Sequence, residues 1–138
     1  MLNKKMLLCT IANPVIVFPL AIVWHLVLFK DRYDQLGYIA REEPIFAFGF
    51  LSMLIQGFLL AYILPFFLNQ YSAKKGLIIC FSVMWLYSWT FHVLAAAAKQ
   101  PLEPLSTWFI IETAYLLIHF GLVGLAFGWI HGCFHANK

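Results

Sequence analysis

The long apolar stretches of this chain contain few side chains that could take part in chemistry. His25 and His92 lie within two of these stretches, and Glu112 is the only Asp, Glu, Lys or Arg between Glu103 and Lys138. Ionisable side chains are costly inside a membrane, so each suggests a function or a buried partner. At 1.5 Å per residue, all three lie about 6–12 Å from the ends of their predicted helices on one side of the membrane. We therefore expect them to converge.

Further polar residues lie at similar depths. His119 follows Glu112 by nearly two helical turns and shares a helix face with Tyr115 and Trp108. Gln56 lies near the middle of another apolar stretch. The sequence thus predicts a polar layer that consists of His25, Gln56, His92, Glu112, Tyr115 and His119.

Four kinds of chemistry fit such a layer. Two histidines and a carboxylate could bind a transition metal, and His25 and His92 on different helices could ligate a haem. A chain of His and Glu could also relay protons. The plainest interpretation is a hydrogen-bonded network that fixes helix packing. This last interpretation is favoured because the residues of the layer form no H-x-x-x-H, H-E-x-x-H or E-x-x-H motif.

The elements that must position these residues are transmembrane helices. The chain is 63% hydrophobic and 11% charged, whereas an ordinary soluble domain is about 45–50% apolar and about 25% charged. Four nearly charge-free windows are each long enough for one crossing of about 20 residues, and none is long enough for two. We expect an all-α membrane protein with one domain over residues 1–138, a compact bundle of four helices at residues 6–29, 44–68, 76–98 and 105–131.

The distribution of basic residues predicts the orientation. The lysines on one side of the membrane have no acidic neighbours, and such a side is usually cytoplasmic. These lysines are Lys4, Lys5, Lys74, Lys75 and Lys138. Both termini are therefore expected in the cytoplasm. The net charge of +3 is scattered, so no nucleic-acid-binding patch is expected.

Three cysteines lie at helix ends on that same side. Cys9, Cys80 and Cys133 should stay free in a reducing cytoplasm. Two metal sites remain as alternatives, one formed by the three thiolates and one by His131, Cys133 and His135. No C-x-x-C spacing supports the first.

Small residues predict close helix contacts. Two predicted helices carry them, and such residues let helix backbones approach one another. They are Gly49, Ser52 and Gly57 in one helix, and Gly121, Gly124 and Gly128 in the other. We expect contacts within the bundle more than contacts with a partner helix. The mixed-charge loop over residues 30–38 is expected to be solvated, with partner binding as the alternative.

Two short similarities predict an internal repeat. Trp24-His25-Leu26-Val27 resembles Phe91-His92-Val93-Leu94, and Glu43-Pro44 resembles Glu103-Pro104. The first two segments lie in the first and third predicted helices, and the Glu-Pro pairs precede the second and fourth. The pattern predicts two parallel units of two helices each.

The order of these features resembles a known family. The segment from Trp24 through Phe29-Lys30 to Leu36-Gly37, followed by a last helix with an aromatic, a His and glycines from Tyr115 to Gly128, is similar to a family of small four-helix bacterial inner-membrane proteins of unknown function. That family usually has Trp-Tyr where this chain has Trp24-His25. The resemblance implies the four-helix fold and a multi-pass location in the bacterial inner membrane. It implies no activity, cofactor or catalytic residue.

These observations favour a non-enzymatic helix bundle in the lipid bilayer. Short loops and small-residue faces suggest an accessory or scaffold subunit of a larger membrane complex, or a homo-oligomer. The alternative is a carrier of protons or small solutes, or a redox protein that binds haem or metal at the polar layer. A membrane enzyme ranks third because no nucleophile–base pair is evident and no catalytic residue is expected.

Overall fold

The structure, a computed structural model, describes residues 3–38 and 43–134 and consists of helices in these ranges. Two segments are π-helical, with wider turns than an α-helix, and continue the helix before them. In chain order the elements are α1 (Lys4–Ile22), the π-helix η1 (Val23–Leu28), α2 (Lys30–Gln35), α3 (Phe46–Gln70), α4 (Ala73–Trp89), the π-helix η2 (Thr90–Leu94), α5 (Ala95–Lys99) and α6 (Leu105–His131).

In the described part of the chain, four continuous helices are long and apolar enough to cross a membrane, which confirms the predicted fold class. They are Lys4–Leu28, Phe46–Gln70, Ala73–Lys99 and Leu105–His131. The fourth has the predicted bounds, and the others differ by a few residues. The helix expected to begin at Pro44 begins at Phe46, with Pro44 and Ile45 in the segment before it.

Local chemistry explains where the first and last helices end. The side chain of Asn3 accepts a hydrogen bond of 2.8 Å from the backbone N–H of Met6, which is a typical N-cap. Gly132 follows α6 with a φ of 77°, in the left-handed region that glycine adopts without strain. Its N–H and that of Cys133 bond to the last carbonyls of the helix, so the helix terminates there.

The outer surface of the bundle is apolar. Ile110 and Trp129 are 70% and 73% exposed, and large hydrophobic side chains are exposed on all four spanning helices. Apolar patches of this extent mark a membrane-facing surface. Together with the four long apolar helices, this surface fits a lipid bilayer.

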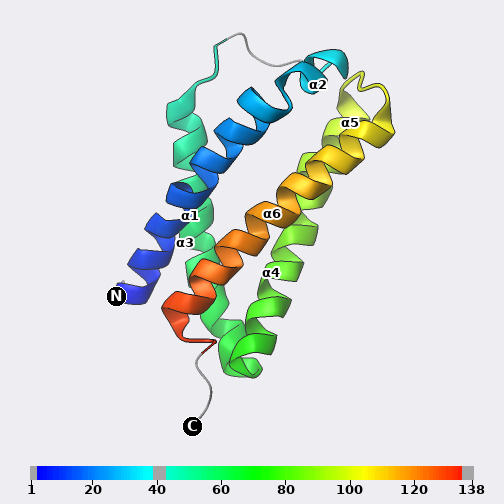
Figure 1. Ribbon diagram of the computed structural model, residues 1–138. Coiled ribbons are helices and arrows are strands. Elements are labelled where there is room, and N and C mark those ends of the chain that lie inside the picture. Colours follow the sequence, from blue (N-terminus) through cyan, green and yellow to red (C-terminus); the bar gives the residue numbers. More distant parts are fainter. Residues whose placement is uncertain (1–2, 39–42, 135–138) are drawn as a thin grey trace.

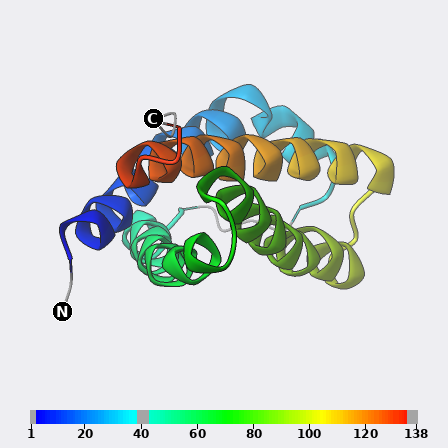
Figure 2. The ribbon, with the colours of Figure 1, turned by 90° about the horizontal axis from the view of Figure 1, so that it is seen from below.

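The four helices form a ring in which each contacts two neighbours. α1 packs against α3 and α6, and α4 packs against the same two helices. Figure 2 shows α1, α2 and α6 on one side of the bundle and α3 and α4 on the other. In its most apolar stretch, α6 buries 44% of its residues, against 22% in each other spanning helix. α6 is therefore the central element of the core.

The described ends of the chain lie at the same end of the bundle (Figure 1). Lys5 Nζ donates a hydrogen bond of 3.5 Å to the carbonyl of His131. Lys74 and Lys75 begin α4 at this end, which we call the basic end. The opposite end carries α2 and α5 and is called the α2/α5 end (Figure 1).

The predicted small-residue positions differ in what they contact. A methyl group at Gly57 would lie 2.6 Å from Asn13 Cβ and 2.8 Å from the carbonyl oxygen of Thr10, so α1 and α3 approach closely there. Gly124 faces the ring of Phe81. Gly128 contacts side chains of α4 and of the segment after α6, whereas Gly49 and Gly121 have no atom within 4 Å of an added methyl, and Ser52 is exposed.

Candidate functional site

Three side chains from separate helices meet at the α2/α5 end. His25 lies in η1, His92 in η2 and Glu112 in α6. One ligand atom from each lies within 4.8 Å of the other two. Within the described ranges, this is the one group of three or more His, Cys, Asp or Glu side chains that could hold a metal ion. We call these three residues the His/Glu centre.

Glu112 is the buried member of the centre. Its Oε2 lies 2.6 Å from His92 Nε2, which donates to it, and its Oε1 lies 3.7 Å from His25 Nε2. The side chain of Glu112 is 1% exposed, whereas those of His25 and His92 are 29% and 43% exposed. A buried carboxylate needs hydrogen-bond donors or counter-charges. His92 supplies one such partner, and both histidines extend from Glu112 toward the surface.

Both histidines are placed by π-helical turns. The two segments that match in the sequence, Trp24–Val27 and Phe91–Leu94, lie in η1 and η2. A π-turn adds a residue and changes which face the following side chains occupy, and such turns are frequent at functional sites. In α1 and η1, His25 Nδ1 lies 3.0 Å from the carbonyl of Ala21. In η2, the carbonyl of Val93 accepts a 3.1 Å hydrogen bond from Trp108 Nε1.

The contact with Ala21 fixes the protonation of the His25 ring. A carbonyl oxygen only accepts, so Nδ1 carries the proton that it donates. The other nitrogen, Nε2, then has a free lone pair in the neutral ring and faces Glu112. Histidines that bind metals are commonly oriented in this way by a backbone carbonyl.

Tyr33 contacts the His/Glu centre, although the sequence did not predict it as a member of the polar layer. Its hydroxyl donates a hydrogen bond to Glu112 Oε1. Burial, and then the negative charge of Glu112, raise the pKa of Tyr33, so its phenol keeps the proton that it donates. Tyr33 lies in α2, within the loop that was expected to be solvated.

The folding of α2 follows from a short amphipathic pattern. Tyr33 and Leu36 are buried, while the charged residues around them are exposed. The carbonyl of Leu36 accepts a 3.0 Å hydrogen bond from the N–H of Glu103, which ties α2 to the segment before α6. The i, i+3 spacing of Tyr33 and Leu36 is the sequence feature that could have predicted this helix.

Aromatic rings enclose the centre. The Tyr33 ring stacks on His25 with centroids 5.2 Å apart, and Tyr115 meets His25 edge-on at 4.7 Å. Tyr38 stacks on Trp108 at 5.5 Å. Tyr115, a predicted member of the polar layer, therefore lies beside the centre through ring contacts.

Two predicted members of the layer lie outside the centre. The His119 ring is 5.9 Å from that of Tyr115, and both its nitrogens are buried without a hydrogen-bond partner. Gln56 Oε1 accepts a 3.3 Å hydrogen bond from Asn13 Nδ2. Asn13 precedes His25 by twelve residues of helix, or about 18 Å, so Gln56 belongs to a different level. The sequence indicated only the approximate depth of each residue along its own helix, which is not precise enough to predict contacts between helices.

The basic end contains potential ligands that do not assemble. Cys9, Cys80 and Cys133 are buried and free. They form no group with metal-binding geometry among the described residues. The alternative site of His131, Cys133 and His135 cannot be compared in full, because His135 lies outside the described residues.

The geometry distinguishes between the possible cofactors. Two axial histidines of a haem must approach the iron from opposite faces of a flat ring. Here the Glu112 carboxylate lies within 2.6 Å of one histidine and 3.7 Å of the other, in the space that the ring would need. A single ion could instead lie among the three side chains. The arrangement therefore fits a metal ion better than a haem.

Comparisons with protein-family models, curated proteins and solved structures found no match to this chain. The resemblance to the inner-membrane family of unknown function thus stays a prediction. The function is argued from the His/Glu centre.

Proposed function

We propose that this protein is a non-enzymatic membrane helix bundle that binds a divalent transition-metal ion at the His/Glu centre. The observation that carries the proposal is the clustering of one ligand atom each from His25, His92 and Glu112 within 4.8 Å. Ligands of one zinc-like ion lie about 2.0–2.2 Å from it, and so at most about 4 Å apart. A small inward movement of side chains is enough to reach this geometry.

The donor set indicates the kind of ion. Imidazole suits zinc, copper, iron and nickel, whereas magnesium and calcium prefer oxygen ligands alone. Two imidazoles and one carboxylate leave further coordination positions open. A metal ion binds only a histidine nitrogen that carries no proton, so protonation of His25 or His92 competes with the ion. We therefore expect affinity to fall as the pH is lowered.

The proposed location follows from the charge pattern and the family resemblance. The unopposed lysines favour a cytoplasmic basic end. The α2/α5 end, with the His/Glu centre, would then face the outside of the bacterial inner membrane. The ion would reach the centre from that side.

Metal titration in mild detergent tests the proposal. Chelator-treated protein should bind one Co²⁺ or Zn²⁺ ion per chain. The absorption spectrum of bound Co²⁺ and calorimetry both measure this binding. His25→Ala, His92→Ala and Glu112→Gln should each weaken binding at least tenfold. His131→Ala, at the other end of the bundle, is the matched control and should bind as the wild type does. Absence of a stoichiometric ion, or a Soret band from bound haem, would refute the proposal.

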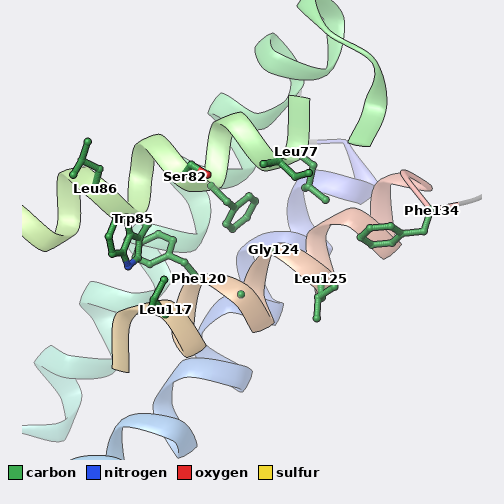
Figure 3. Close-up of a pocket in the computed structure, with 12 residues that line it drawn as sticks. Leu77, Ser82, Trp85, Leu86, Leu117, Phe120, Gly124, Leu125 and Phe134 are labelled. Atoms are coloured by element: carbon green, nitrogen blue, oxygen red, sulfur yellow. The ribbon is translucent and has the colours of Figure 1, made fainter. Parts of the chain in front are cut away.

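A role as an accessory or scaffold subunit is the second candidate, favoured by a groove between α4 and α6. The groove has a volume of about 660 Å³ and an apolar lining that includes Trp85, Leu117 and Phe120 (Figure 3). Gly121 lies in this lining and leaves open space beside it. A transmembrane helix of another subunit, or of a second copy, would fit against this surface.

Co-purification tests this second candidate. A partner that docks in the groove should appear at a fixed ratio with the wild-type protein and be lost from Gly121→Trp, which fills the groove. The same partner at the same ratio in both preparations would exclude the groove as its docking site.

A further inference from the structure

Two recesses adjoin the His/Glu centre and share no lining residue. One has a volume of about 190 Å³, lies between α1 and α3, and includes His25 in its lining. The other, about 200 Å³, lies beside η2 and α5 and includes His92. We call them the α1/α3 recess and the α5 recess. Each histidine therefore connects one recess to the buried Glu112.

The two recesses differ in polarity. Apart from His25, the α1/α3 recess is lined by apolar side chains such as Phe18, Ile22 and Phe46. The α5 recess includes Lys99, Gln100 and Tyr38, at the end of a spanning helix and in the segments that flank it. Lysines and tyrosines at such positions mark the interface between membrane and water. The α5 recess therefore opens to water, and the α1/α3 recess opens to hydrocarbon.

An ion in water would encounter the two recesses at very different cost. Moving a charged group into hydrocarbon is unfavourable, so a hydrated cation avoids an apolar recess. His92 is also the more exposed histidine, at 43% against 29% for His25. Its Nε2 is 2.6 Å from Glu112 Oε2, so an ion that reaches His92 is already beside the carboxylate.

We infer that the α5 recess is the aqueous entrance of the site, through which a divalent ion reaches His92 before it is enclosed by Glu112 and His25. This inference rests on the proposed metal-binding function. The positive charge of Lys99 at the recess opposes the approach of a cation, an effect that acts over about 8–10 Å at ordinary ionic strength. The entrance therefore limits the rate of association, while the three ligands set the affinity.

Stopped-flow measurement of Co²⁺ association tests the entrance with two matched variants. Ala95→Phe places a ring in the α5 recess, and Gly49→Phe places the same ring in the α1/α3 recess, where Gly49 has open space. Ala95→Phe should slow association and dissociation at least tenfold with little change in affinity. Gly49→Phe should leave both rates at the wild-type values. Wild-type rates in Ala95→Phe, or slowing confined to Gly49→Phe, would overturn the inference.

A charge variant provides a second test that does not depend on filling space. Lys99 is exposed, so Lys99→Glu should not disturb folding. It should raise the association rate several-fold at low salt, and the gain should shrink at high salt because the charges are screened. An unchanged rate of Co²⁺ association at low salt would overturn the inference that the α5 recess is the entrance. Failure of the wild type to bind Co²⁺ at all would refute the proposed function itself, so the two failures are distinguishable.

Discussion

The two ends of this bundle are held together in different ways. Toward the basic end, helices approach closely at glycines, and the three buried cysteines have no common partner. At the α2/α5 end, Tyr33 and His92 hydrogen-bond to the buried Glu112, and His25 lies 3.7 Å from its carboxylate. Both ends contain residue types that bind metals, but among the described residues only the α2/α5 end brings them together. Residue type alone therefore does not make a site.

The close contact toward the basic end has a backbone cause. Pro14 has no N–H, so it cannot bond to the carbonyl of Thr10 four residues earlier. That carbonyl oxygen lies 2.8 Å from the position of a methyl group at Gly57. Asn13, fully buried beside it, donates a 2.7 Å hydrogen bond to the carbonyl of Met53 on α3. A proline, a glycine and an asparagine thus join α1 to α3 without any ionisable group.

The largest expected effect concerns Glu112. In Glu112→Leu, the hydroxyl of Tyr33 and the Nε2 proton of His92 lose their acceptor. Unsatisfied buried donors cost about 1–3 kcal/mol each, so we expect a loss of about 2–4 kcal/mol in unfolding free energy. Glu112→Gln keeps an acceptor and should remain close to the wild type. Thermal unfolding in detergent, followed by circular dichroism, measures the difference. Equal stability of the two variants would show that the centre does not hold this end together.

A smaller effect is expected from glycine substitutions toward the other end. Gly57→Ala would place a methyl against the backbone of Thr10 and against Asn13, and such overpacking costs about 1–3 kcal/mol. Gly121→Ala makes the same chemical change where no atom lies within 4 Å, so its stability should equal or exceed that of the wild type. The same unfolding measurement compares them. A similar loss in both would mean that helix approach at Gly57 is not what joins α1 and α3.

The smallest effect is expected from the cysteines. Burial raises the pKa of the Cys133 thiol, an effect that the charge of Lys5 offsets only in part. Because the thiolate is the reactive form, alkylation of Cys133 in the folded protein should be slow at pH 7.5 and faster at pH 9. Mass spectrometry of iodoacetamide-treated protein measures this. Cys133→Ala should leave the metal stoichiometry unchanged, and a loss of bound metal would place the site at the basic end instead.

Much of the fold could be predicted from the sequence because lipid imposes strict rules. A crossing requires about 20 apolar residues, and charges are excluded from it. Long uncharged windows therefore predicted four helices, and the last one has the predicted bounds, Leu105–His131. The small residues were harder to interpret. Gly57 and Gly121 look alike in sequence, and only the neighbouring helix distinguishes a contact from open space.

The candidate site was predictable only in part. The cost of ionisable groups in a membrane singled out His25, His92 and Glu112, which the structure brings together. It equally singled out His119, which has no hydrogen-bond partner in the core. Tyr33 was missed because a tyrosine among charged residues in a loop resembles a solvated side chain. Its contact with Glu112 joins residues far apart in the chain.

The sequence by itself determined the number of membrane-spanning helices, their approximate bounds, and the residues whose burial needs an explanation. These features depend on the transfer of side chains from water to lipid. Tertiary structure decided which of those residues meet. The side-chain direction along a helix changes with every extra residue in a turn, so the π-turns η1 and η2 set where His25 and His92 point. Folding of α2 over that end then supplied Tyr33. Such contacts depend on the distances between helices, and the periodicity of residues along one helix gives no information about these distances.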